Sequence, residues 1–188
     1  MKMRLVPTLF LPAVLAPPLT AQVQPAEPPE PSRVIGAALE VIKAARYCSF
    51  ITVGPDGQPQ ARIVDPLVTP DPLTLWVGTN PLTRKVQQIE RDPRVTMLCF
   101  NPAAYEYVTI LGRADAVTDS AQKASHWKSE WAGFYRDEHR GPDFLLLRMR
   151  PFRLEVVSPR HGLVNDPRTW RPVVLDLPGG GAGYDSQP

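Results

Sequence analysis

The sequence predicts a mainly β fold of the α+β type, a small barrel of six antiparallel strands with short flanking helices. Three observations predict it. From Tyr47 to Val157, short β-rich segments alternate with turns that contain Pro or Gly. One segment before them has apolar residues at helical spacing. Hydrophobic residues make up 43% of the 188 residues and charged residues 21%, which excludes a wholly disordered, fibrous or multi-pass membrane protein.

The first expected elements are a helix and a β-hairpin. Ser32 is the expected helix cap, and the turn signal Gly54-Pro55-Asp56-Gly57 joins the first two strands. The inward face of the helix is expected to carry Ile35, Leu39, Ile42 and Ala45. The six strands are expected at residues 47–53, 60–68, 73–77, 95–100, 105–117 and 144–157.

A short helix is expected between the third and fourth strands. Thr83 is its expected cap, and the helix covers residues 84–91 with Val86 and Ile89 facing inward. In the long fifth strand, Gly112 marks a bulge.

A third helix is expected after the fifth strand. Asp119 and Gln122 resemble a capping box at its start. Helical spacing then places Ala124, Trp127, Trp131 and Phe134 on one face.

The two ends of the chain differ in composition from its middle. The 23 prolines are more than twice the usual share of about 5%. Residues 1–21 have a basic start, a short apolar run broken by prolines and a cleavage site at Leu19-Thr20-Ala21, which is the pattern of an export signal and not of a stable membrane span. A Pro-rich linker (22–31), the folded domain (32–159) and a C-terminal extension (160–188) with a disordered end are expected to follow. The expected location is periplasmic or extracellular if the signal is real, and cytoplasmic otherwise.

Charge and cysteine content restrict the function classes. The net charge is only +2 and no basic stripe stands out, so a nucleic-acid partner is not expected. Cys48 and Cys99 are the two cysteines and are not at metal-ligand spacing, so neither a zinc cluster nor another metal site is expected. Two separate buried thiols on strands are the favoured interpretation, and export leaves a Cys48–Cys99 disulfide as the alternative.

One stretch has the residue types of an anion site. Thr83, Arg84 and Lys85 stand at the start of a predicted helix, and Arg62 lies on the second strand. A helix start offers unpaired N–H groups, whereas cations there are disfavoured by the helix dipole. A bound phosphate would remove that conflict. The alternative is a pair of solvated basic residues on a surface helix.

These residues resemble a known family. Residues 61–118 are similar to the pyridoxamine 5′-phosphate oxidase-like FMN-binding split barrels, especially the small general-stress-protein type. The resemblance includes Arg62-Ile63-Val64, Leu75-Trp76-Val77-Gly78-Thr79-Asn80, Thr83-Arg84-Lys85-Val86-Gln87-Gln88-Ile89, Asp92-Pro93-Arg94-Val95 and Tyr107-Val108-Thr109-Ile110-Leu111-Gly112-Arg113-Ala114. It implies a six-stranded split barrel that binds FMN at the interface of a homodimer.

The resemblance also implies roles for single residues. Arg62 and Lys85 would hold the FMN phosphate, supported by Arg84 and Thr83. Flavin contacts would come from Ile63, Val64, Gly78 and Thr79, and Gln88 and Tyr107 would lie near the cofactor. The helical spacing of Trp127 and Trp131 favours core or dimer packing over a position covering the flavin.

The chain departs from the oxidases near its end. The oxidases have Glu-Phe-Trp and then an Arg-Leu-His-Asp-Arg type of segment, whereas this chain has Glu155-Val156-Val157 followed by Arg160-His161-Gly162. The expected function is therefore an FMN-dependent oxidoreductase with an unidentified small-molecule substrate. The alternative is a non-catalytic protein that binds or senses flavin, haem or the deazaflavin F420 on the same barrel. No catalytic residue can be assigned: the three histidines are scattered, and solvated positions are favoured for His126 and His139.

Overall fold

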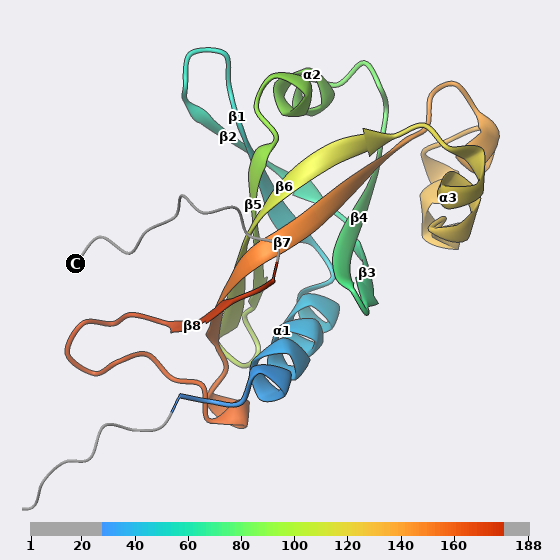
Figure 1. Ribbon diagram of the computed structural model, residues 1–188. Helices are drawn as coiled ribbons and strands as arrows, with labels where there is room; N and C mark the ends of the chain where they lie inside the picture. Colours follow the sequence, from blue (N-terminus) through green and yellow to red (C-terminus); the bar gives the residue numbers. More distant parts are fainter. Residues whose placement is uncertain (1–27, 179–188) are drawn as a thin grey trace, which may run out of the picture.

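The computed structural model describes residues 28–178 (Figure 1). The expected signal peptide, most of the expected linker and the end of the C-terminal extension lie outside these residues. The helices are α1 (Pro31–Ala45), α2 (Arg84–Arg91) and α3 (Ser120–Ser125), with short 3-10 turns at Ser129–Gly133, Glu138–Arg140 and Pro159–His161. The strands are β1 (Cys48–Val53), β2 (Pro59–Val64), β3 (Leu67–Pro70), β4 (Leu73–Thr79), β5 (Arg94–Asn101), β6 (Glu106–Val117), β7 (Leu145–Val157) and β8 (Val173–Asp176).

The predicted mainly β, α+β fold is confirmed, with eight strands in place of six. They form one open antiparallel sheet in the order β2-β1-β5-β6-β7-β4-β3, and β8 pairs with β7. The single strand predicted at 60–68 is wrong, because the chain leaves β2 at Asp65-Pro66 and starts β3 at Leu67. Proline cannot donate a ladder hydrogen bond, so it ends the pairing there. The four-residue strand β8 was not expected.

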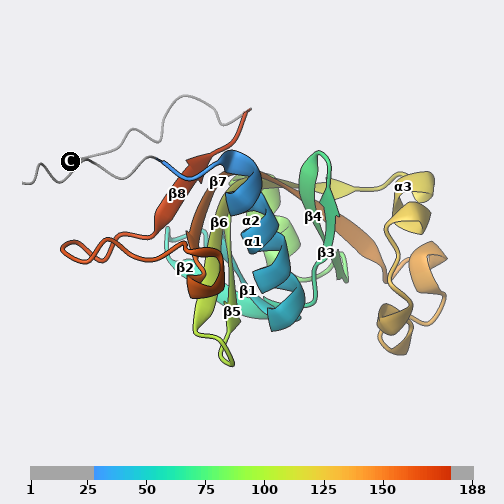
Figure 2. The same cartoon turned by 90° about the horizontal axis from the view of Figure 1, so that it is seen from below.

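Helix α1 packs against β5, β6 and β7, as Figure 2 shows from below. Its buried residues are Val34, Ala37, Ala38, Val41 and Ile42. The predicted inward face is therefore rotated, since Ile35, Leu39 and Ala45 are only partly buried. Ser32 is not the cap either. Glu30 occupies that position and Pro31 is the first helical residue, where its fixed φ and missing N–H are well tolerated.

Local signals in the middle of the chain are confirmed. Helix α2 follows Thr83 with Val86 and Ile89 buried, and the Asp119 side chain accepts a hydrogen bond from the Gln122 N–H at the start of α3. The register between β6 and β7 shifts between Leu111 and Gly112. A Cβ on Gly112 would lie 2.6 Å from the Arg150 carbonyl oxygen, so the bulge requires glycine.

The segment between α3 and β7 does not form the long helix that was predicted. Helix α3 ends at Ser125 and the chain continues through the two short 3-10 turns. Trp131 is buried in a small second core, with Trp76, Val117, Phe144 and Leu146. Phe134 is 80% exposed, so the predicted single face is wrong. Trp127 and Tyr135 pack against this second core, and their rings meet each other edge to face.

Cys48 and Cys99 form a disulfide, contrary to the favoured expectation of separate thiols. The two residues face each other directly in the β1–β5 pairing, and both side chains belong to the main core. That pairing is set by strand register, which the cysteine spacing of 51 residues does not reveal.

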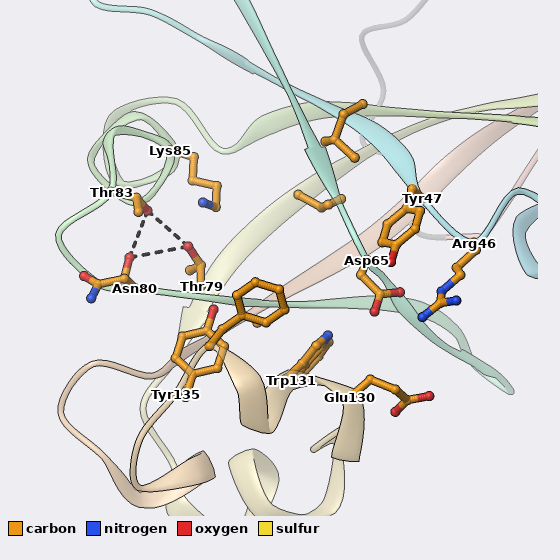
Figure 3. Close-up of a pocket in the computed structure, with 14 residues that line it drawn as sticks. Arg46, Tyr47, Asp65, Thr79, Asn80, Thr83, Lys85, Glu130, Trp131 and Tyr135 are labelled. Carbon is orange, nitrogen blue, oxygen red and sulfur yellow. Dashed lines mark hydrogen bonds between the residues drawn. The ribbon is translucent and has the colours of Figure 1, made fainter.

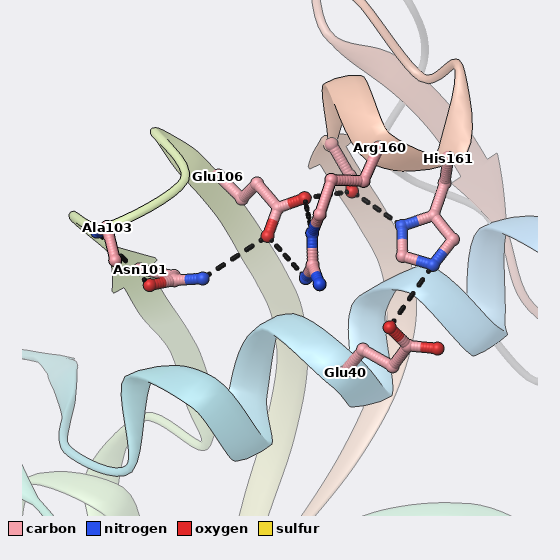
Figure 4. A network of polar contacts seen from close by, with 7 residues as sticks. Glu40, Asn101, Ala103, Glu106, Arg160 and His161 are labelled. Atoms are coloured by element: carbon pink, nitrogen blue, oxygen red, sulfur yellow. Dashed lines mark hydrogen bonds and ion pairs between the residues drawn. The ribbon is translucent and has the colours of Figure 1, made fainter.

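A buried carboxylate fixes the chain where it leaves β7 (Figure 4). The side chain of Glu106 is fully buried and accepts two 2.7 Å hydrogen bonds from Arg160 and one from the Ser158 hydroxyl. These donors hold the pKa of Glu106 down to about 2. Ser158 also contacts His161 Nδ1, and His161 Nε2 lies 3.3 Å from Glu40 on α1. The start of the C-terminal extension is therefore fastened to both β6 and α1.

Replacing Arg160 by leucine is expected to lower stability at pH 7 and to flatten its dependence on acid. The ordinary pKa of a glutamate is 4.5, so ionised Glu106 contributes fully above that pH, and its contribution is lost as pH falls toward 2. Without Arg160 the pKa of Glu106 rises, so less stability remains to be lost in that window. Urea unfolding between pH 7 and pH 2.5 measures the effect, with Arg33→Leu on the exposed side of α1 as control. Parallel pH curves for the two variants would contradict this account.

Candidate functional site

A cavity of about 500 Å³ opens beside the ends of β2 and β4 and the start of α2 (Figure 3). Segment 129–135 forms its opposite wall with Trp131 and Tyr135. Thr83 and Lys85 lie at one end of the cavity and Arg46 and Asp65 at the other. The lining residues are Arg46, Tyr47, Ile63, Val64, Asp65, Gly78, Thr79, Asn80, Thr83, Lys85, Glu130, Trp131, Phe134 and Tyr135.

The turn before α2 is held by its own polar side chains. The Thr83 hydroxyl donates to the Asn80 carbonyl oxygen at 2.8 Å and lies 3.1 Å from the Thr79 hydroxyl. The Asn80 side chain accepts a hydrogen bond from the Leu82 N–H. Thr83 occupies the cap position of α2, but its side chain makes no capping hydrogen bond. The positive end of this helix therefore stands beside the cavity without a side-chain acceptor from its cap residue.

Three cations gather around this end of the cavity. Burial, and secondarily the charge of Arg62, lowers the pKa of Lys85. Burial, and secondarily the charge of Arg84, lowers the pKa of Arg62. Among residues 28–178, no carboxylate lies within ion-pair distance of Arg62, Arg84 or Lys85. Positive charge is therefore concentrated here, and no carboxylate of residues 28–178 pairs with it.

Arg62 is held in place by neutral acceptors. Its guanidinium donates to Thr52 Oγ1 at 2.6 Å, to the Phe50 carbonyl oxygen at 3.3 Å and to Gln88 Oε1 at 3.1 Å. Gln88 in turn donates to Gln60. This network ties β1, β2 and α2 together behind the cavity, and it fixes the position of the Arg62 charge.

The structure brings most of the expected cofactor residues together. Ile63, Val64, Gly78, Thr79, Thr83 and Lys85 line the cavity. Arg62 and Gln88 lie in the network behind it, and Arg84 is exposed in the first turn of α2. Tyr107 is remote within this chain: it pairs with Val157, whereas Gly78 pairs with Leu146 at the other end of β7.

Gly78 has a packing role that the sequence did not reveal. A Cβ on this residue would lie 2.9 Å from ring atoms of both Trp131 and Phe144. The absence of a side chain therefore lets the wall formed by segment 129–135 pack closely on β4. Trp131 itself is only 4% exposed, so it serves both as core and as cavity wall.

The sequence did not reveal the residues at the far end of the cavity or two residues of its opposite wall. Arg46, Tyr47 and Asp65 come from the ends of α1 and β2, and Glu130 and Tyr135 come from the irregular segment before β7. Only the Asp65-Pro66 break offered a local signal. Burial, with the charge of Asp143, raises the pKa of Tyr135 to about 12, so its hydroxyl stays protonated at neutral pH.

An ion pair fastens the wall to the sheet. Lys128 Nζ lies 2.5 Å from Asp65 Oδ1, and both side chains are less than one-fifth exposed (18% and 17%). This half-enclosed pair joins the segment before Ser129–Gly133 to the β2–β3 connection.

The described residues contain no group of three His, Cys, Asp or Glu side chains placed to hold a metal ion. Of the helices within 28–178, none is long and apolar enough to cross a membrane.

Comparison with solved structures relates the fold to general stress proteins. A protein from Clostridium acetobutylicum related to general stress protein 26 has a TM-score of 0.65 at 14% identity, over 77% of this chain and 95% of that one. General stress protein 26 from Bacillus anthracis has a TM-score of 0.62 at 19% identity, over 77% and 99%. A pyridoxamine 5′-phosphate oxidase-related, FMN-binding protein from Nostoc punctiforme has a TM-score of 0.52 at 17% identity, over 80% and 99%.

No curated protein sequence matches the chain. The sequence pattern of the pyridoxamine 5′-phosphate oxidase family, however, matches residues 35–158. That range runs from α1 to the end of β7 and includes every strand that lines the cavity. The antiparallel sheet with its few helices is the split-barrel architecture expected for that family. The chain therefore belongs to the pyridoxamine 5′-phosphate oxidase family.

Proposed function

We propose that the cavity binds FMN and that the protein is a flavin-dependent oxidoreductase acting on a small molecule. The observation that carries the proposal is the group of three cations, Arg62, Arg84 and Lys85, which lacks a carboxylate partner within residues 28–178 and adjoins the cavity at the start of α2. The structurally similar protein from Nostoc punctiforme is itself FMN-binding, which supports the choice of ligand.

The residues present fit FMN. Lys85 and the start of α2 suit a phosphate at one end of the cavity. Ile63, Val64 and Trp131 supply apolar surface for a planar ring system beyond it. The volume of about 500 Å³ falls in the usual range of ligand sites, roughly 300–1,000 Å³.

The protein's own contribution would be binding and orientation. When bound, FMN supplies hydride or single-electron transfer. Lys85 would hold its phosphate, and Arg62 would add positive charge from its place outside the cavity lining. Trp131 would exclude water from one side of the cavity. The Tyr135 hydroxyl, whose pKa is raised to about 12, would remain a hydrogen-bond donor to any acceptor in the cavity.

A second candidate function is non-catalytic binding of a flavin, of haem or of F420. It is favoured by the contacts of the segment that corresponds to the substrate-binding residues of the oxidases. In this chain Arg160 donates hydrogen bonds to Glu106, and His161 contacts Ser158 and Glu40. These side chains are committed to holding the fold, so oxidation of pyridoxamine phosphate is not the activity we propose.

We further propose a homodimer that forms on the outer face of the sheet. Ile63, Ser49 and Leu98 lie opposite one another across β2, β1 and β5. Ile63 is 67% exposed, Leu98 37% and Phe100 49%, which gives this face an apolar surface. Ile63 also lines the cavity, so a second copy seated on this face would stand next to the cofactor site.

Export is proposed from the disulfide together with the expected signal. Disulfides persist in oxidising compartments and are rare in the cytosol. The Cys48–Cys99 bond therefore agrees with a periplasmic or extracellular location.

Replacing Lys85 by glutamine is expected to weaken FMN binding about 10- to 100-fold, because a charge-assisted hydrogen bond contributes about 1.5–3 kcal/mol. Riboflavin lacks the phosphate, so its affinity should not change. Quenching of flavin fluorescence measures both, and Arg91→Gln at the other end of α2 is the control. Equal losses for FMN and riboflavin would place the phosphate elsewhere, and wild-type protein that binds haem or F420 but no flavin would refute the FMN proposal.

Reduction of the bound flavin distinguishes the two candidate functions. Bound flavin that NADH or NADPH reduces supports the oxidoreductase, whereas flavin that neither reduces favours the non-catalytic binding protein.

The variant Leu98→Asp is expected to convert the dimer to monomers, because it places a charge in the apolar face. Sedimentation velocity gives the mass of each species. Val164→Asp, at an exposed apolar residue after the Pro159–His161 turn, should remain dimeric. Monomeric wild-type protein would refute the proposal.

The full-length chain, expressed in a Gram-negative host, is expected in the periplasmic fraction with its N-terminus at Gln22 and without free thiols. Mass spectrometry after alkylation without reduction checks both points. A chain lacking residues 2–21 serves as control and should stay in the cytoplasm. Unprocessed full-length protein confined to the cytoplasm would rule export out.

A further inference from the structure

A second cavity, of about 340 Å³, adjoins the first one. It is lined by Leu39, Ile42, Lys43, Arg46, Asp65, Pro66, Leu67, Val68 and Lys128. Arg46 and Asp65 line both cavities. The two spaces are therefore neighbours that share these two side chains as part of their walls.

The second cavity combines an apolar interior with positive charge. Leu39, Ile42, Leu67 and Val68 come from the last turns of α1 and from β3, and they supply surface that favours hydrocarbon. Lys43, Arg46 and Lys128 are its cations, and Asp65 is its one carboxylate.

The carboxylate does not neutralise all of these cations. Asp65 is paired with Lys128 at 2.5 Å. Within the described part of the chain, no carboxylate lies within 4 Å of the charged groups of Lys43 or Arg46. Within residues 28–178, Lys43 and Arg46 are thus without an ion-pair partner beside an apolar space, and the Arg46 guanidinium lies 5.1 Å from the centre of the Tyr47 ring.

Arg46 has a backbone conformation that arginine rarely adopts. It closes α1 with φ 60° and ψ −54°, and its N–H donates to the Ile42 carbonyl oxygen. Glycine is the usual residue at the end of a helix where φ is positive, because a Cβ is strained there. A cation near a helix C-terminus is favourable, and Lys43 in the last turn already supplies one. The helix dipole therefore does not explain why position 46, with its positive φ, carries a side chain. Such strain is typically found at ligand sites.

We propose that the second cavity binds an amphipathic monocarboxylate, with its hydrocarbon body among Leu39, Ile42 and Val68 and its carboxylate between Lys43 and Arg46. Arg46 also borders the first cavity, so the acid group would lie at the junction of the two sites. A neutral or cationic molecule of the same length would lack the charge complement of this junction. The site does not depend on FMN, so this proposal and the flavin proposal fail separately.

Decanoate is a suitable probe, and decanol and decyltrimethylammonium are its neutral and cationic counterparts. Isothermal titration calorimetry with the full chain is expected to show decanoate binding at least 10-fold more tightly than either counterpart. Lys43→Gln should weaken decanoate binding at least 5-fold and leave decanol binding unchanged. Arg33→Gln, an exposed position on the same helix, should change neither.

Two further variants separate a binding role from a structural one. Arg46→Gly removes the side chain and relieves the strained φ, so it should keep or raise the melting temperature while weakening decanoate at least 10-fold. Leu39→Trp fills the apolar part and should weaken decanoate and decanol alike. Absence of decanoate binding, equal affinity for decanol, or full affinity in Arg46→Gly would each overturn the proposal. Protein that binds decanoate but not FMN would leave it intact and refute only the flavin site.

Discussion

The long pairing of β6 with β7 is the constraint on which the other elements depend. It joins residues from Tyr107 to Val117 with residues from Leu146 to Val157. Strands β5, β4 and β8 attach to its free edges. The close approach of Gly112 to the Arg150 carbonyl oxygen allows the register shift in its middle. On the Val117 side of that shift, β7 pairs with β4 from Leu145 to Met149, and Gly78 of β4 lies close to Trp131 and Phe144. The cavity wall thus packs on the β4–β7 pair, which the long β6–β7 pairing supports.

What the sequence predicted well was local. Helix α2 and the Asp119 cap depend on residues within a few positions of one another, and the bulge at Gly112 is marked by a single glycine. Several misses depended on distant partners, whereas the cap of α1 and the break at Asp65-Pro66 were local. β8 is a strand only because Glu155 and its neighbours offer a free edge, and the inward face of α1 is chosen by the sheet it packs on. The disulfide required the register of β1 against β5, which cysteine spacing does not contain.

The same division applies to the candidate site. The stretch from Gly78 to Lys85 is continuous in the chain, so the grouping of Thr79, Thr83 and Lys85 at a helix start could be predicted from the residue types. Arg46 and Tyr135 come from elements far from this stretch in the sequence, one on either side, and no pattern in their own neighbourhood signals a site. Tyr107 shows the opposite case: the family resemblance assigned it to the cofactor, but within one chain the sheet places it at the far end of β6. Only a second copy on the outer face could bring such a residue near a cofactor.

Electrostatics links both cavities to the stability of the fold. Burial first, and then the like charge of a neighbouring arginine, lowers the pKa values of Arg62 and Lys85, so the folded protein bears an energetic cost that the unfolded chain avoids. Neutral acceptors such as Gln88 hold Arg62 without cancelling its charge. An anion that binds only the folded state relieves this repulsion and stabilises the fold by mass action. The Lys128–Asp65 pair has the opposite character, because it is already satisfied. It joins the segment before Ser129–Gly133 to the β2–β3 connection without needing a ligand in either cavity.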